Sequence, residues 1–347
     1  MKTFAKPHEA STIVEVAEST GISISTVSRS LSKPDLVAPE TLSRVLKAVV
    51  ELNYQPNQLA RGLRQKRSGV IGLAAPDISS PFQSKIAKGL QEVAAAHGYQ
   101  LFLCSTDEDS PKEELLLRSL KAYQLQGLVI IPTARTKQNL RHLDGLPIVE
   151  VDRTTSQQTI SAILVDNERG AKEAVEHLIS LGHTRIATVT GRLSTTTGRE
   201  RLHGYQQALA EADLPTEASW VVEGNHFEET GYRAAIKLLS LPDSLNFTAL
   251  FAANGDVTAG ALQAVQERGL NIPHDLSLIG FDDSRWARLV TPPLTVVEQP
   301  AFEMGYMAGE QLFRLLDGTE LKSLEHRLQP RLILRKSTAP PKGGGLL

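Results

Sequence analysis

The chain has 347 residues, of which 41% are hydrophobic and 22% are charged, proportions typical of globular proteins rather than disordered or fibrous ones. At roughly 150 residues per domain, this length predicts two or three compact units. The single cysteine, Cys104, excludes an internal disulfide and any metal centre built from several thiolates. Residues 1–10 lack the apolar core of a secretory signal, and no apolar run approaches a membrane span. We therefore expect a cytoplasmic protein with no membrane partner.

The net charge of −2 conceals an uneven distribution along the chain. Residues 1–67 contain ten Lys and Arg against six Asp and Glu, a net charge of +4, which leaves −6 for the remainder. Four of these cations, Arg61, Arg64, Lys66 and Arg67, lie close together. Such a cluster contacts phosphates where nucleic acid is bound and is otherwise a solvated linker, and the charge alone leaves both interpretations open.

Residues 1–56 are expected to form an all-α head that begins with a helix-turn-helix. Thr12 and Glu15 have the spacing of a capping box, which opens a helix that ends at Gly21. Ser23 can cap a second helix that extends to about residue 31. Two helices joined by a glycine-containing turn, the second polar on its outer face, are typical of a unit that enters the DNA major groove.

A third helix is predicted over residues 39–52. Its apolar positions follow helical spacing and are expected to face the core: Leu42, Val45, Leu46 and Val49. The same pattern is also that of a three-helix bundle without any ligand, and periodicity alone does not separate the two.

From Gly69 onward, short apolar runs alternate with amphipathic helices, which predicts parallel α/β sheets. The runs expected as strands are 70–75, 100–104, 127–131, 147–151 and 160–165, then 185–189, 220–223, 248–253 and 277–281. They predict two parallel-sheet subdomains. A helix over 301–316 and a strand over 331–335 would return the chain across both, so we expect a clamshell hinged near Gln299 and Pro300. The body should span residues 69–337, with a disordered tail over 338–347.

Polar residues follow several predicted strands, at the sheet edge where parallel α/β folds bind ligands. These residues are Asp152 with Arg153, Asn254 with Asp256, and Asp282 with Asp283. Arg199 is expected at a helix N-terminus that faces the same crevice, and Phe82 offers a ring for the apolar face of a sugar. Carboxylates beside an arginine suit polyol hydroxyls. Taken singly, each residue fits a structural role such as capping or ion pairing equally well.

Four segments of the head, residues 12–17, 21–23, 26–29 and 53–57, have an order and spacing that resemble the lactose-repressor family of bacterial transcriptional regulators. The resemblance implies base contacts at Ile24, Ser25 and Arg29 and phosphate contacts at Thr26 and Ser28. A bidentate guanidinium matches guanine O6 and N7 and is worth about 1–3 kcal/mol of discrimination. Arg29 is therefore the strongest candidate among these residues.

The resemblance also implies a hinge helix within residues 57–68, paired with that of a second protomer in the DNA minor groove. The contacts that it assigns to this segment are Asn57, Leu59 and Leu63. A leucine at position 63 would wedge between base steps and kink the duplex. Packing of Leu63 on the body remains an alternative. Gly62 weakens such a helix by about 1 kcal/mol relative to alanine.

Further segments of the body resemble the same family, at residues 76–82, 152–153, 182–187, 198–205, 253–254 and 280–283. The resemblance implies an effector site lined by Phe82, Asp152, Arg199, Asn254 and Asp282. Three positions depart from the family pattern: Gln83 and His226 stand where rings are common, and Gly255 stands where an aspartate is common. The loss of two rings disfavours a flat purine, so a sugar or sugar derivative is expected.

These observations predict a sequence-specific DNA-binding regulator that binds a palindromic operator as a homodimer, and the family's commoner mode implies a repressor. No catalytic residue, metal ligand or cofactor is expected, because no phosphate loop, GxGxxG, GxSxG or HExxH motif occurs. The alternative is a soluble sugar-binding transport-type protein without a DNA role. That class shares the two-lobed body but has a signal peptide and no head.

Overall fold

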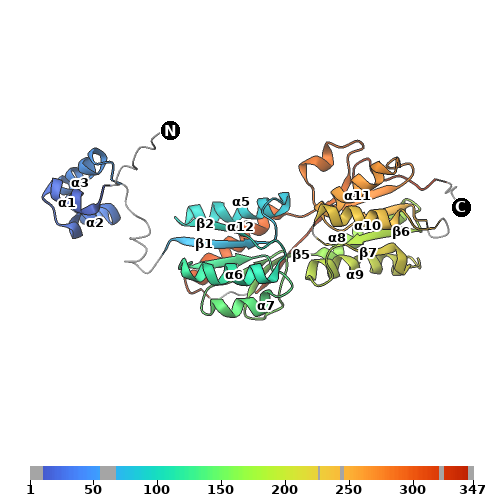
Figure 1. The fold of residues 1–347 in the computed structure, drawn as a ribbon, viewed down its shortest axis with the longest axis horizontal. Helices are drawn as coiled ribbons and strands as arrows, with labels where there is room; N and C mark the ends of the chain where they lie inside the picture. The colour runs from blue at the N-terminus through green and yellow to red at the C-terminus, as the bar shows by residue number, and fades with distance from the viewer. Residues whose placement is uncertain (1–10, 55–67, 226, 243–245, 320–323, 343–347) are drawn as a thin grey trace, which may run out of the picture. The chain divides into compact units, whose positions relative to one another are not determined.

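The computed structural model describes residues 11–54, 68–225, 227–242, 246–319 and 324–342. The chain divides into two compact units, residues 1–68 and 69–347 (Figure 1). We call them the head and the body. None of the helices in the described part of the chain combines the length and apolar character needed to cross a bilayer.

The head contains α1 (Ile13–Thr20), α2 (Ile24–Ser32) and α3 (Pro39–Glu51). The capping box is confirmed, because the Glu15 amide donates to Thr12 Oγ1 and the Thr12 amide donates to Glu15 Oε2. Gly21 ends α1 with a φ of 66°, a left-handed conformation that glycine adopts without steric cost. Ser23 caps α2 by accepting from the Thr26 amide. The predicted helix-turn-helix is therefore present.

The core of the head is formed by Val16, Ala17, Val27, Val45 and Ala48. The prediction for Leu46 is wrong, since this side chain is 47% exposed. Successive residues of a helix are about 100° apart, so Val45 and Ala48 share the inner face while position 46 turns outward. Arg44 ties α3 to α1 by donating to the Thr20 carbonyl at 2.6 Å.

The body contains two six-stranded sheets, which define a first and a second lobe (Figure 1). The first sheet has the order β11-β5-β4-β3-β1-β2 and consists of β1 (Val70–Ala75), β2 (Gln100–Ser105), β3 (Gly127–Ile130), β4 (Ile148–Val151), β5 (Ser161–Val165) and β11 (Glu325–Leu328). The second has the order β12-β10-β9-β8-β6-β7 and consists of β6 (Ile186–Thr190), β7 (Val221–Glu223), β8 (Ala249–Ala252), β9 (Ser277–Phe281), β10 (Thr295–Glu298) and β12 (Arg331–Ile333). Pairing is parallel apart from that of β12 with β10.

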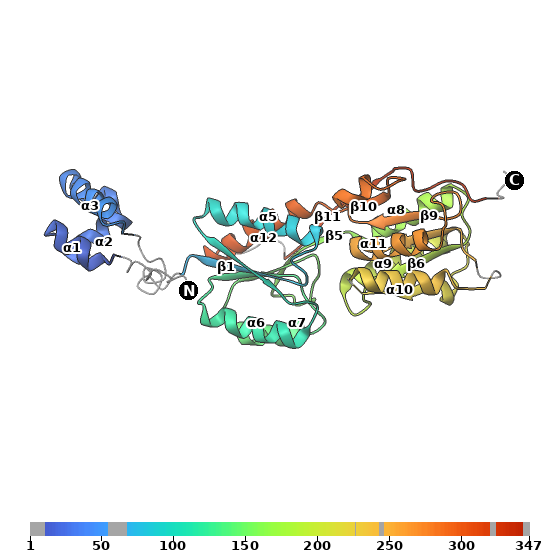
Figure 2. The same ribbon diagram turned by 45° about the horizontal axis from the view of Figure 1, so that its top comes forward.

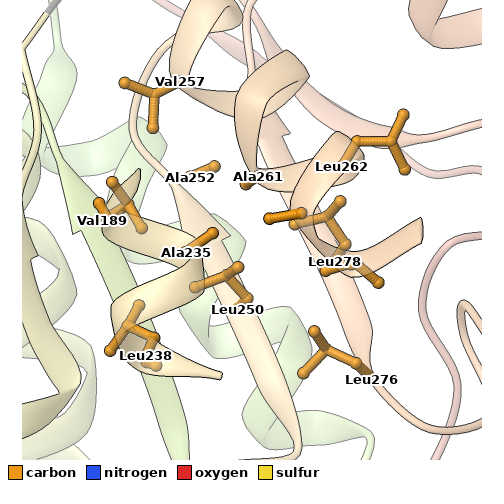
Figure 3. Packing of buried hydrophobic residues seen from close by; sticks show 14 of the residues in the cluster. Val189, Ala235, Leu238, Leu250, Ala252, Val257, Ala261, Leu262, Leu276 and Leu278 are labelled. Carbon is orange, nitrogen blue, oxygen red and sulfur yellow. The ribbon is translucent and has the colours of Figure 1, made fainter. Parts of the chain in front are cut away.

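Helices cover both faces of each sheet (Figure 2). On the first sheet, α5 (Pro81–Ala96) and α12 (Ala301–Leu316) lie on one face, and α6 (Ser110–Ala122) and α7 (Thr136–Asn139) lie on the other. On the second sheet, α8 (Asn167–Ser180) and α9 (Thr196–Glu211) lie opposite α10 (Glu228–Leu238) and α11 (Gly255–Glu267). Short 3-10 turns occur at Pro34–Leu36, Leu140–Leu143, Ala218–Trp220 and Arg285–Arg288. Figure 3 shows how Leu250 and Leu278 of the second sheet pack among Leu238 and Ala261 of the covering helices.

The chain passes between the lobes at three described places: from β5 to α8, from β10 to α12 and from β11 to β12. Two of these crossings are joined, because the Asp166 amide donates to the Leu328 carbonyl at 3.0 Å. The predicted return of the chain through residues 301–316 and 331–335 is confirmed in its connectivity, although β12 ends at Ile333. The expected two-lobed α/β body is therefore observed.

Over residues 338–342 the structure departs from the expected disordered tail, and residues 343–347 lie outside the described residues. Ala339 is held on both sides, since its amide donates to Ser277 Oγ at 3.0 Å and its carbonyl accepts from His183 Nε2 at 2.9 Å. Thr338 Oγ1 lies 3.0 Å from His177 Nε2, and Lys342 pairs with Asp275. Residues 338–342 are ordered because the second lobe supplies hydrogen-bond partners that the composition of the tail does not reveal.

Candidate functional site

The outer side of α2 presents the residues expected to contact DNA. Ile24 is 41% exposed, Ser25 and Arg29 are exposed, and Thr26 and Ser28 are half-buried. Ser25 and Arg29 are one helical turn apart and therefore lie on the same side of α2. Val27 faces the core and anchors the helix. The remaining expected contacts, Asn57, Leu59 and Leu63, lie outside the described residues, as does Gly62.

A small cavity of about 40 Å³ lies between the two lobes of the body, and we call it the effector pocket. Four of the five predicted effector residues line it: Phe82, Asp152, Asn254 and Asp282. Eight further lining residues were not among the predicted contacts: Ser80, Gln83, Arg153, Thr197, Arg201, Gly255, Asp256 and Gln299. The pocket therefore combines carboxylates, guanidinium groups and amides around one half-buried ring.

Asp152 and Asp282 occupy matching places in the two lobes. Asp152 follows β4 and its amide donates to Ile163 of β5, while Asp282 follows β9 and its amide donates to Val297 of β10. Their φ angles are 67° and 74°, in the left-handed region that non-glycine residues seldom adopt. Strained backbone of this kind concentrates at functional sites, where it aims a side chain.

Helix α9 contributes Arg201 to the effector pocket rather than the predicted Arg199. Arg201 Nε donates to Asn167 Oδ1 and its NH1 donates to the Ala253 carbonyl, both at 2.7 Å. Its guanidinium carbon lies 3.8 Å from the centre of the Phe281 ring, a cation–π contact. Burial lowers the pKa of Arg201, while the nearby Asp282 and Asp152 carboxylates raise it.

Arg199 was expected to face the crevice between the lobes because it lies in the first turn of α9, the helix that also carries Arg201. Its side chain is exposed, donates from NH1 to the Leu193 carbonyl at 3.1 Å and lines a different cavity. Thr197 and Arg201 are four residues apart and share the helix face that lines the effector pocket, whereas position 199 is rotated about 200° from Thr197. The motif therefore supplies Arg201 to the effector pocket and Arg199 to the other cavity, and a contact between Arg199 and the effector stays a prediction.

Arg153 and Glu108 form a buried ion pair next to Asp152. Arg153 NH1 lies 2.7 Å from Glu108 Oε1, and both side chains are less than 5% exposed. Arg153 Nε lies 3.5 Å from Asp152 Oδ2. Within the described residues, three buried polar atoms of the pocket lining have no hydrogen-bond partner: Asp152 Oδ1, Arg153 Nε and Gln299 Oε1. Two of these atoms accept and one donates.

Two carboxyl groups of the pocket have strongly perturbed pKa values. Burial raises the pKa of Asp152 from 3.8 to about 6, against the lowering effect of Arg153 and Arg201. Burial and the Asp282 carboxylate likewise raise the pKa of Asp256 to about 6. Perturbed carboxyl groups in a cleft mark candidate functional sites.

Asn254 and Asp282 also have structural roles. Asn254 caps α11, because Oδ1 accepts from the Val257 amide at 2.8 Å, and its Nδ2 donates to the Asn225 carbonyl. Asp282 accepts from Gln299 Nε2 at 2.6 Å and from the Gly255 amide at 3.1 Å. Asn254 and Asp282 therefore have the structural roles that the sequence also allowed, and both residues line the pocket as well.

The three positions that depart from the family pattern have different surroundings. Gln83 lines the pocket and its Oε1 accepts from the Asp77 amide at 2.8 Å, which fixes the loop before α5. Gly255 presents its amide to Asp282, and His226 lies outside the described residues.

Sequence reasoning missed Gln299 and Glu108 as members of the site. Gln299 lies at the crossing that was predicted as a hinge, so its position at the lobe interface was foreseeable. Glu108 follows β2 and is 6% exposed, and no sequence signal pairs it with Arg153. The i, i+4 spacing of Thr197 and Arg201 could have identified Arg201.

Comparisons with known proteins agree with both parts of the fold. A family described as bacterial regulatory proteins, lacI family, matches residues 12–57, and a periplasmic binding protein-like domain matches residues 175–338. The chain is 36% identical over 334 residues to the HTH-type transcriptional regulator DegA of Bacillus subtilis, covering 95% of this chain and 98% of that protein.

Two solved structures are similar over nearly the whole chain. A lac repressor dimer bound to operator and the anti-inducer ONPF has a TM-score of 0.85 and 28% identity, covering 95% of this chain and all of that one. A CelR–cellobiose complex has a TM-score of 0.73 and 28% identity, covering 94% and 99%. The match over the head sets aside the transport-protein alternative. The chain belongs to the lacI family of bacterial regulatory proteins and is a DNA-binding transcriptional regulator.

Proposed function

We propose that the protein is a repressor that binds a palindromic operator as a homodimer and is controlled by a sugar or sugar derivative bound between the lobes of the body. The observation that carries the effector assignment is a set of buried atoms at Asp152, Arg153 and Gln299 that have no hydrogen-bond partner among the described residues. Because operator DNA is its target, the proposal includes a cytoplasmic location.

The DNA-binding assignment rests on the outer side of α2. Its exposed Ser25 and Arg29 would read base edges in the major groove, with Ile24 in apolar contact and Thr26 and Ser28 near phosphates. Asn57, Leu59 and Leu63 would act in the minor groove through a hinge helix. The lac repressor dimer bound to operator provides a precedent in a similar fold.

The homodimer assignment is supported by an apolar surface on the first lobe. β2 is the end strand of its sheet, and its Phe102 and Leu103 are 41% and 43% exposed. The Phe102 ring stacks on Tyr123, with 5.6 Å between ring centroids. An exposed apolar end strand is a pairing surface, so we assign it to a second copy of the chain.

A hydroxylated ligand suits the effector pocket because a hydroxyl group both donates and accepts. Such groups would satisfy the acceptors Asp152 Oδ1 and Gln299 Oε1 and the donor Arg153 Nε together. Arg201 and Asp282 offer further polar contacts, and Phe82 offers an apolar face. A cavity of about 40 Å³ is too small for a monosaccharide, so the lobes must separate for a ligand to enter.

Control of DNA binding would follow from the hinge. The lobes are joined by crossings near Asp166, Gln299 and Gln329, and the pocket lies between them. A ligand that favours one separation of the lobes would change how two protomers present their heads. It shifts that equilibrium only by its difference in affinity for the two states.

A thermal-shift panel of pentoses, hexoses, disaccharides, sugar derivatives and purines tests the effector class. A ligand at 100 times its Kd stabilises the fold by about 2.7 kcal/mol. We expect stabilisation by a sugar or sugar derivative that disappears in Asp282→Ala, with DNA binding retained. Stabilisation by purines alone would contradict the proposal, and joint loss of ligand and DNA binding would indicate a folding defect.

A further inference from the structure

A second cavity, of about 210 Å³, lies between the same two lobes and is lined by residues 132–134, 137–138 and 153–156 of the first lobe and by residues 194–196 and 199 of the second. We call it the basic cavity. Arg153 lines both this cavity and the effector pocket, so the two adjoin at this residue. The Thr154 amide donates to Thr196 Oγ1 at 3.3 Å and links the lobes along one wall.

The charges on this lining have one sign. Lys137, Arg153 and Arg199 line the basic cavity, and no Asp or Glu among the described residues does. Arg153 is paired with Glu108, but neither Lys137 nor Arg199 forms an ion pair within the described residues. Arg153 Nε is buried and has no hydrogen-bond partner among the described residues. The cavity therefore holds positive charge that no described carboxylate neutralises.

The other groups of the lining also favour an anion. Most are hydroxyl side chains, including Thr133, Ser156 and Ser194, and each of these can donate to an oxyanion. Helix α9 begins at Thr196 on the same wall, which places the positive end of its dipole beside the cavity.

A second neutral sugar ring fits this lining poorly. The effector pocket offers Phe82 and the carboxyl groups of Asp152, Asp256 and Asp282, which suit a ring face and its hydroxyls. The described residues that line the basic cavity include neither an aromatic ring nor a carboxylate. The contrast between adjoining cavities indicates a ligand with two chemically different ends.

We propose that the effector is a hydroxylated molecule with one anionic group, a sugar phosphate or a sugar acid, whose hydroxyls bind in the effector pocket and whose anion binds in the basic cavity beside Lys137 and Arg199. This inference rests on the proposed function and narrows the class of effector. It also accounts for Arg199 as a contact to the ligand's anionic group instead of its ring.

Matched ligands test the assignment without any variant. Glucose, glucose 6-phosphate and glucuronate form one set, ribose and ribose 5-phosphate form another, and cellobiose represents a neutral disaccharide. We expect an anionic member to bind the full-length protein at least tenfold more tightly than its neutral parent, as measured by calorimetry. Its affinity should fall with added salt, because the contacts are between charges.

The double variant K137Q/R199Q removes the two unpaired cations while leaving Arg153 and the effector pocket intact. Both side chains are exposed, so the fold should be retained. The affinity for the anionic ligand should fall about tenfold or more, since hydrogen bonds to charged groups are of that strength. The affinity of the double variant for the neutral parent sugar should change less than twofold. The matched control K121Q/R185Q alters two exposed cations elsewhere and should leave both affinities unchanged.

The inference is overturned if no anionic compound binds, if neutral parents bind as tightly as their anionic partners, or if K137Q/R199Q binds the anionic ligand normally. Tight binding of a neutral sugar that depends on Asp282 would overturn the inference while the proposed function stands. If no sugar or sugar derivative binds, both the inference and the proposed effector class are overturned.

Discussion

The guanidinium of Arg201 is held by Asn167, whose Oδ1 accepts the hydrogen of Arg201 Nε at 2.7 Å. The same amide donates through Nδ2 to Glu200 at 2.8 Å, and Glu200 pairs with Arg327 of β11 at 3.1 Å. Asn167 opens α8 directly after one crossing between the lobes, and Arg327 stands just before another. Arg201 in the lining of the effector pocket is therefore connected to two of the crossings on which the lobes would turn.

Replacing Asn167 with alanine should lower the affinity of the protein for its effector without abolishing DNA binding. Arg201 would lose an acceptor that orients its guanidinium, and a hydrogen bond to a charged group contributes about 1.5–3 kcal/mol. Effector affinity should fall by at least tenfold in calorimetry. Asn271→Ala, in an exposed loop of the second lobe, is the control and should bind normally. Unchanged affinity in Asn167→Ala would contradict a positioning role.

Replacing Asp152 with asparagine should stabilise the body at neutral pH. Burial raises the pKa of Asp152 from 3.8 to about 6, so the folded state binds this proton more tightly than the unfolded state. Stability contributed by this group therefore falls as pH rises from 3.8 to about 6, by up to about 3 kcal/mol. Asp152→Asn should melt at a higher temperature than the parent at pH 7.5 and similarly at pH 4.

Asp283→Asn provides the opposing control for that measurement. Asp283 pairs with Arg288 at 2.5 Å and with Arg335 at 2.8 Å, so its replacement should lower the melting temperature at pH 7.5. If both variants lose stability at neutral pH, the Asp152 carboxylate is stabilised by its surroundings and the account of its pKa is wrong.

Replacing Arg29 with alanine should relax sequence preference more than it weakens DNA binding in general. A bidentate contact to guanine contributes about 1–3 kcal/mol of discrimination, or roughly 5- to 150-fold between matched and mismatched sites. Competition binding with selected and scrambled DNA measures this ratio. Lys47→Ala on α3, whose side chain pairs weakly with Glu51 at 3.8 Å, should retain the preference. Full discrimination by Arg29→Ala would exclude base reading by this residue.

Replacing Phe102 with aspartate should convert a dimer into a monomer. Charge on the exposed end strand opposes its burial against a second copy, at a cost of several kcal/mol for an unpaired buried carboxylate. Sedimentation should show a dimer for the parent and a monomer for Phe102→Asp. Leu334→Asp places the same charge at another side chain that is 59% exposed and should remain dimeric. Dimerisation of Phe102→Asp would place the interface elsewhere.

Local patterns predicted most of the fold. Val70–Ala75, Ser277–Phe281 and Ala301–Leu316 have the expected bounds, because each is a continuous apolar or amphipathic run with a clear stop. β10 and β11 were not predicted as strands. β11 is a polar end strand whose partner, β5, is distant in sequence, and no periodicity within four residues reveals such pairing.

The candidate site was only partly predictable for a similar reason. Strand ends placed Asp152 at the carboxyl edge of the first sheet and Asn254 and Asp282 at that of the second, and all three line the pocket between the lobes. The choice between Arg199 and Arg201 depends on the rotation of α9 against the sheet, which tertiary packing determines. Glu108 reaches Arg153 from another strand end, and the sequence contains no sign of that pairing.

The most direct test of the account combines DNA and ligand in one measurement. DNA is selected from a random pool with the full-length protein, and its affinity is then measured by fluorescence anisotropy with and without the compound that stabilises the protein. We predict that an inverted repeat is enriched, that the compound changes its affinity at least tenfold, and that Asp282→Ala binds the same DNA but does not respond. Selection that enriches no sequence, or a full response in Asp282→Ala, would contradict the account.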